Sequence, residues 1–165
     1  MSPYSQNVKV AVVQASPLFF DRGGSVKKVV TLTRQAGEAG ARLVLFPEAY
    51  VGGDPWGLAF GTAVGGRSPA GRRTWERYWR TAMEVPGPET ETLAKAAMEA
   101  GVYLAVGVIE RDSRYSQGTL FFTLLYFGPE GTLLGKHRKL KPTAAERLIW
   151  GEGDGCPEGE EWATV

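Results

Sequence analysis

The sequence is poor in the residues from which many active sites are built. Its 165 residues include one cysteine, Cys156, and one histidine, His137. An intrachain disulfide is therefore impossible, and a reducing, cytoplasmic setting is expected. Metal sites made from several His or Cys side chains are excluded, and a Ser–His or Cys–His catalytic pair can use only His137. The chemistry has to come from carboxylates, lysines and one thiol.

A charge excess and long apolar runs are missing as well. Nineteen Lys and Arg face 18 Asp and Glu, so there is no electrostatic case for a nucleic-acid or membrane partner. No apolar run reaches the roughly 20 residues of a membrane span, and the start, MSPYSQNVKV, lacks the pattern of a secretory signal. The length and the 43% hydrophobic content predict one soluble globular domain. A nucleic-acid alternative has only a few arginines to rest on, namely Arg67, Arg72, Arg73, Arg77 and Arg80.

The first third of the chain has the pattern strand, helix, strand. Residues 8–16 (VKVAVVQAS) are a short valine-rich strand, and residues 41–46 (ARLVLF) are a continuous apolar strand expected to be covered on both faces. Between them, residues 23–40 have helical spacing at Val26, Val29, Val30 and Thr33 and end at Gly40. The order predicts a right-handed crossover between parallel strands.

The middle of the chain predicts two helices. A long segment, 52–87, begins as a glycine-rich loop, and its part 70–85 is expected to be helical. In residues 86–101 a proline precedes the helix, acids occupy its first turn and Gly101 lies beyond its end. Its apolar face is expected to comprise Leu93, Ala96, Ala97 and Ala100.

The last part predicts three strands. Residues 102–110 form one, and residues 119–127 and 131–140 form a hairpin around the turn GPEG. Residues 151–165 are loop-like. The alternation of strands and helices along the chain predicts an α/β fold.

Glu48 is the first candidate for chemistry. It stands where the strand 41–46 reaches its carboxyl end, the edge at which open α/β sheets bind ligands. Neighbouring Phe46, Pro47 and Tyr50 are expected to withdraw it partly from water, which strengthens a general base. The alternative is a surface acid in a turn.

Three lysines and a second glutamate form the other candidates. If residues 131–140 are a strand that continues to Lys141, alternation puts Lys139 and Lys141 on one face and Lys136 on the other. A lysine near a glutamate could stabilise an oxyanion, although lysines also protect edge strands from aggregation. In TAAERLIWGEGDG, a helical turn would place Glu146 and Trp150 on one side.

Three stretches carry a resemblance to a known family. FPEAYVGG, VPGPETETLAKAA and above all HRKLKPTAAERLIWGEGDG resemble the nitrilase branch of the carbon–nitrogen hydrolase family, from about Val8 to the last residue. GRSPAGRRTWERYW is similar to bacterial nitrilases. The resemblance implies a four-layer α-β-β-α sandwich, a homodimer that extends into larger spiral oligomers, and no metal or organic cofactor.

The family uses a Glu–Lys–Cys triad with a second glutamate beside it. Matched by motif, Glu48 is the implied general base, Lys139 the lysine and Glu146 the supporting glutamate. Tyr50 and Trp150 match pocket-lining aromatic positions, with core packing as the alternative. The family's cysteine lies a few tens of residues beyond the lysine, in a CWEN-like motif. This chain stops at EEWATV, about where the strand before that motif should begin.

Cys156 directly follows GEGDG, where the family usually has a small polar residue, so it is not the expected nucleophile. Residues 1–165 are therefore interpreted as a single carbon–nitrogen hydrolase domain that stops before its nucleophile. The implied reaction is hydrolysis of a small-molecule nitrile to a carboxylic acid and ammonia. A cyanide-degrading hydrolase, an amidase and a non-catalytic fragment remain alternatives, and the segment after Lys139 argues against the amidase.

Overall fold

The computed structural model describes residues 7–55, 64 and 66–154, and its centre is one mixed sheet. Five strands are hydrogen-bonded in the order β1-β2-β3-β4-β5. The first three pair in parallel, and β4 and β5 continue the sheet antiparallel. The strands are β1 (Val10–Val12), β2 (Leu43–Leu45), β3 (Tyr103–Arg111), β4 (Leu120–Phe127) and β5 (Leu133–Arg138).

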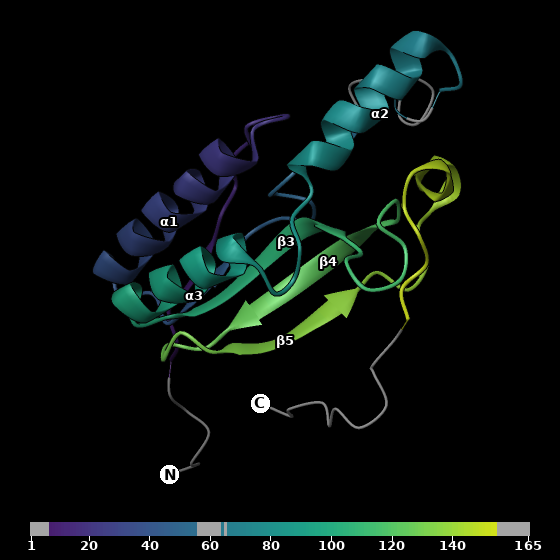
Figure 1. The fold of residues 1–165 in the computed structure, drawn as a ribbon. Helices are drawn as coiled ribbons and strands as arrows, with labels where there is room; N and C mark the ends of the chain where they lie inside the picture. Colours follow the sequence, from purple (N-terminus) through teal and green to yellow (C-terminus); the bar gives the residue numbers. More distant parts are fainter. Residues whose placement is uncertain (1–6, 56–63, 65, 155–165) are drawn as a thin grey trace.

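Two helices, α1 (Arg22–Glu38) and α3 (Pro88–Ala100), lie side by side on one face of the sheet (Figure 1). Both follow from local signals: Asp21 caps the start of α1, and α3 begins with Pro88 and ends at Gly101, whose φ is 61°. The main core lies between these helices and the sheet. It includes Val29, Val44, Leu93, Leu104, Val106 and Leu125, all at most 1% exposed.

A second, smaller core lies at one end of the opposite sheet face. There α2 (Pro69–Thr81) and the 3-10 helix η2 (Ala144–Leu148) approach the sheet, and α2 extends beyond its edge (Figure 1). This core contains Ala49, Tyr78, Ile109, Leu120, Phe122, Ile149 and Trp150. Because side chains alternate along a strand, Val108 faces the main core and Ile109 the smaller one.

The expectation that the strand at 41–46 is covered on both faces is wrong for the described residues. Val44 is fully buried beneath the helices. Leu45 on the other face is 38% exposed, and on β1 Val10 is 47% and Val12 72% exposed. The described residues place no layer over this part of the sheet.

Several predicted boundaries also moved. β1 covers only the middle of residues 8–16, and β5 ends at Arg138. The helix expected at 70–85 stops at Thr81, because Ala82 turns to extended geometry and Met83 then bridges to Glu110 of β3. Helical periodicity could not reveal that bridge, since its partner lies 27 residues further along the chain.

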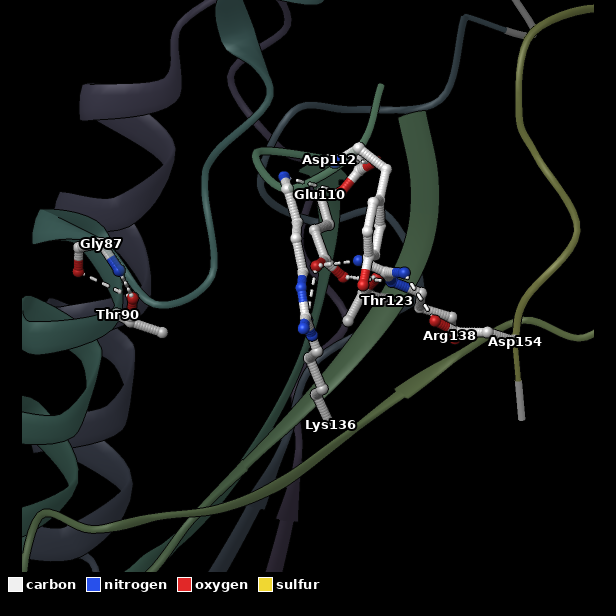
Figure 2. A network of polar contacts seen from close by, with 10 residues as sticks. Gly87, Thr90, Glu110, Asp112, Thr123, Lys136, Arg138 and Asp154 are labelled. Carbon is white, nitrogen blue, oxygen red and sulfur yellow. Dashed lines mark hydrogen bonds and ion pairs between the residues drawn. The ribbon is translucent and has the colours of Figure 1, made fainter. Parts of the chain in front are cut away.

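A buried carboxylate, Glu110, joins the last three strands (Figure 2). Its Oε1 accepts hydrogen bonds from Lys136 Nζ at 2.6 Å and from an Arg138 terminal nitrogen at 2.7 Å. Its Oε2 accepts from Thr123 Oγ1 at 2.7 Å and from Arg138 Nε at 3.1 Å. Arg138 also donates to Asp154 at 2.8 Å, which ties the segment after η2 to the sheet. Burial alone raises the pKa of Glu110, but the bonds from Arg138, Lys136 and Thr123 lower it further than burial raises it.

Replacing Glu110 by Gln should make the stability of the protein less sensitive to acid. The lowered pKa means that the carboxylate contributes its full stabilisation above the unfolded pKa, roughly 4.3, and loses it as pH falls through the folded pKa. We expect Glu110→Gln to cost about 2 kcal/mol at pH 7 and progressively less below about pH 4, measured by urea unfolding.

The matched control is Glu38→Gln, whose carboxylate lies 4.0 Å from Arg34 in an exposed pair and should change stability by less than about 0.5 kcal/mol. A cost for Glu110→Gln that is equally large at pH 3 and pH 7 would contradict the charge-based account.

Gly107 of β3 allows the turn after β2 to approach the sheet closely. A Cβ atom at position 107 would lie 2.3 Å from the Pro47 oxygen, 2.6 Å from Glu48 Cα and 2.8 Å from Ala49 N. Ala49 itself has a φ of 54°, in the left-handed region. The turn is therefore held in a costly backbone shape by its packing against a strand that lacks a side chain at that point.

We predict that Gly107→Ala displaces this turn and costs roughly 1–3 kcal/mol of unfolding free energy, because backbone atoms rather than a flexible side chain occupy the space. Gly135→Ala on β5 is the control, since a Cβ there meets nothing within 4 Å. Urea unfolding and a crystal structure of each variant provide the measurement. An unshifted turn in Gly107→Ala would show that the packing is looser than described.

Candidate active site

The fold brings Glu48 close to Lys139, which is 91 residues further along the chain, and to Glu146, which follows Lys139 by seven residues. Glu48 lies in the turn after β2, Lys139 directly follows β5, and Glu146 lies in η2. Lys139 Nζ is 3.3 Å from Glu48 Oε1 and 3.0 Å from Glu146 Oε2. One ammonium group thus lies between two carboxylates.

Glu146 is the more enclosed of the two carboxylates, with its side chain 11% exposed. It closes a capping box with Thr143, whose backbone N–H donates to it. Burial alone raises the pKa of Glu146, but the hydrogen bonds from Thr143 and Lys139 lower it by more. At neutral pH Glu146 is therefore an anion that is hydrogen-bonded to Thr143 and Lys139.

Lys139 is held in its charged form. Partial burial alone lowers its pKa, but the hydrogen bond to Glu146 and the charge of Glu48 raise it by more. Its backbone N–H donates to the Phe122 oxygen at 2.8 Å, so its position relative to β4 is fixed although it lies just past β5.

Glu48 differs from the expectation. Its side chain is 55% exposed, because Phe46 and Tyr50 do not fence it. Those two rings pack against each other in the main core, with centroids 4.9 Å apart. The burial expected around Glu48 is absent among the described residues, and the carboxylate is open to solvent and to any ligand.

The sheet faces on which the three lysines lie were predicted correctly for Lys136 and Lys139 but not for Lys141. Lys136 points to Glu110 on the helix side of the sheet and Lys139 to the opposite side. Lys141 does not share a strand face with Lys139, because β5 ends at Arg138. Lys141 instead pairs with Glu152 at 2.6 Å, away from the three-residue cluster.

A cleft of about 620 Å³ opens beside the cluster, on the sheet face away from α1 and α3. Its lining is mainly apolar, and Glu48 and Lys139 contribute the charged groups. Other lining residues are Val12, Leu45, Gly107, Phe122, Leu124, His137 and Leu140.

Two phenylalanines, Phe46 and Phe122, line this cleft, and the sequence did not single out Phe122, the one next to Lys139. Tyr50 and Trp150, the aromatic pocket candidates, are 1% and 3% exposed and belong to the two cores, as their packing alternative proposed. Phe122 lines the cleft, and Lys139 Nζ lies 4.9 Å from its ring centroid. Alternation in TLFFTLLYF separates Phe122 from Phe121, but it does not indicate which of the two rings lies beneath the lysine.

The described residues contain no group of three or more His, Cys, Asp or Glu side chains arranged to hold a metal ion. In the same part of the chain no helix is both long and apolar enough to cross a membrane. Cys156 lies outside the described residues. Chemically, the cluster offers an accessible carboxylate that can move protons and a fixed ammonium that can stabilise developing negative charge.

Comparison with known proteins adds close relatives. The chain is 52% identical to an aliphatic nitrilase of Sinorhizobium fredii over 147 residues, which are 89% of this chain and 46% of the relative. It is 48% identical to a bifunctional nitrilase/nitrile hydratase of Lupinus angustifolius, over 90% of this chain and 41% of that protein. The chain thus spans less than half the length of these curated relatives.

Solved structures support the fold. An amidase from Nesterenkonia sp. AN1 matches with a TM-score of 0.60 at 15% identity, over 98% of this chain and 54% of the amidase. A carbon–nitrogen hydrolase from Helicobacter pylori matches with a TM-score of 0.58 at 16% identity, over 89% of this chain and 45% of that one. The family model for carbon–nitrogen hydrolases matches residues 9–161, and the chain therefore belongs to the carbon–nitrogen hydrolase family.

Proposed function

We propose that the complete protein is a nitrilase, which hydrolyses a small-molecule nitrile to a carboxylic acid and ammonia. The observation that carries the proposal is the Lys139 ammonium held between Glu48 and Glu146 at the edge of an apolar cleft. The choice of nitriles over other C–N substrates rests on the relatives, whose names are nitrilase or nitrilase/nitrile hydratase.

In this proposal a cysteine beyond Val165, rather than Cys156, supplies the nucleophile. Its thiolate adds to the nitrile carbon, and the nitrogen takes up a proton to give a thioimidate. Water adds next, ammonia leaves, and a thioester remains. A second water molecule releases the acid and regenerates the thiol.

Glu48 moves the protons in these steps, since it is the accessible carboxylate of the cluster. Lys139 stabilises the negative charge of the tetrahedral intermediates, which its fixed ammonium can do without reorganising. Glu146 holds Lys139 in place. No organic cofactor or metal takes part in this scheme.

The architecture of the complete protein is part of the proposal. The apolar residues exposed on β1 and β2 would be covered by a second sheet, completing an α-β-β-α sandwich whose single domain includes residues 1–165. We further propose that it is a cytoplasmic homodimer that extends into spiral oligomers. The exposed sheet face predicts that residues 1–165 alone would aggregate.

The first test is ammonia release by the full-length gene product from a panel of aliphatic, aromatic and arylacetonitriles, cyanide and the matching amides. We expect ammonia and acid from at least one organic nitrile, and little ammonia from the amides. Ammonia from amides alone would show that the protein is an amidase and not a nitrilase. Release from cyanide alone would make it a cyanide-degrading hydrolase, and no release from any compound would favour a non-catalytic protein.

Substitutions test the assigned roles in the same assay. Glu48→Gln and Lys139→Ala should each lower kcat at least about 10²-fold, because one removes the proton carrier and the other the charge stabiliser. Lys141→Ala is the matched control and should retain activity, since Lys141 pairs with Glu152 outside the cluster. An active Lys139→Ala together with an inactive Lys141→Ala would reverse the assignment.

A further inference from the structure

The ammonium of Lys139 has a third neighbour besides the two carboxylates, the ring of Phe122. Nζ lies 4.9 Å from the ring centroid, within the range of a cation–π contact. The Phe122 side chain is 2% exposed, and its backbone oxygen accepts the Lys139 N–H at 2.8 Å. One residue therefore fixes the backbone of Lys139 and also lies beneath its charged end.

The ring is itself held in place by Trp150. The two rings stack with centroids 4.1 Å apart and an interplanar angle of 30°. Trp150 belongs to the segment that carries Glu146, and its backbone N–H donates to the Glu146 backbone oxygen at 3.0 Å. Trp150 also bridges to Leu120 of β4. The stack therefore joins the strand beneath Lys139 to the segment that supplies its carboxylate partner.

We propose that Phe122 is a positioning residue for the reaction, which holds the Lys139 ammonium at the cleft through the face of its ring. This inference rests on the proposed function, because its consequence is a slower turnover. Two carboxylates alone leave Nζ free to shift toward either anion, whereas the ring restrains it from a third side. The negative face of the ring also favours the charged lysine in a site that is partly shielded from water.

The opposite face of the sheet offers a built-in control. The guanidinium of Arg138 lies 4.0 Å from the centroid of the Phe121 ring. Phe121 and Phe122 are consecutive on β4, both largely buried and both beneath a cation, but only Phe122 lies beneath Lys139. A general loss of packing in β4 would follow a change at either ring, and a specific effect on Lys139 only a change at Phe122.

The experiment replaces Phe122, and separately Phe121, with 4-fluoro-, 3,5-difluoro- and 3,4,5-trifluorophenylalanine in the full-length protein. Fluorine withdraws electron density from the ring face while nearly preserving the shape of the ring. If Phe122 served only for packing, activity would therefore not decrease with each added fluorine. Turnover of a nitrile gives kcat and KM. An NMR titration of ¹³Cε-labelled lysine follows the protonation of Lys139 directly, and the Lys139→Arg variant assigns its signal. The label distinguishes this titration from those of Glu48, Glu146 and His137, which face the same cleft or cluster.

We expect the pH at the midpoint of the Lys139 titration to fall stepwise along the Phe122 series, by about 0.5 pH units for the trifluoro ring. Over the same series kcat should fall several-fold while KM changes less than about two-fold, because the ammonium acts on charge that develops after binding. Phe122→Leu should show the full effect, and the Phe121 series should leave both readouts unchanged.

Three outcomes decide between the claims. An unchanged Lys139 titration along the Phe122 series, in a protein that hydrolyses nitriles, overturns the role of Phe122 and leaves the proposed function standing. Equal effects from the Phe121 series also overturn it. A stepwise Lys139 shift in a parent protein that releases no ammonia from any nitrile overturns the proposed function and leaves the contact itself established.

Discussion

The alternation of two neighbouring residues at the end of β5 supports the arrangement of the whole site. Arg138 turns to the helix side of the sheet, where it binds the buried Glu110, and Lys139 turns to the cleft. Since Glu110 also binds Lys136 and Thr123, the carboxylate locks β3, β4 and β5 in one register. A shift of β5 by one residue would exchange the two faces and take the lysine out of the cleft.

The cluster also depends on backbones that approach more closely than side chains allow. Gly107 admits the turn that carries Glu48. Gly153 likewise lets the segment after η2 approach the backbone at Arg138 and Lys139, because a Cβ at position 153 would lie 2.5 Å from the Arg138 oxygen. Glu48 directly precedes Ala49, whose φ is 54°, and Glu146 lies two residues after Ala144, whose φ is 43°. Such backbone shapes persist only where packing over-determines them, which is common at functional sites.

The sequence predicted those features whose causes are local. The Pro88 start and Gly101 end define α3, and GPEG between two apolar runs defines the hairpin. The residues of the cluster came from matched motifs, and the structure brings them within hydrogen-bonding distance. Two properties were not predictable, namely the exposure of Glu48 and the place of Phe122, and the sequence left open whether Trp150 lines the pocket or packs in the core. Each depends on which distant segment covers which face, and strand periodicity does not contain that information.

The unequal surroundings of the two carboxylates support a division of labour between them. Glu146 accepts from Thr143 and Lys139, and protonating it would break bonds that shape η2 and hold the lysine. Glu48 shares only longer contacts with Lys139, 3.3 and 3.4 Å, and its side chain is open to the cleft. Taking up a proton there disturbs little of the fold. For the proposed nitrilase reaction, these surroundings favour Glu48 as the base that gains and loses protons in every turnover, and Glu146 as the fixed anion that orients Lys139.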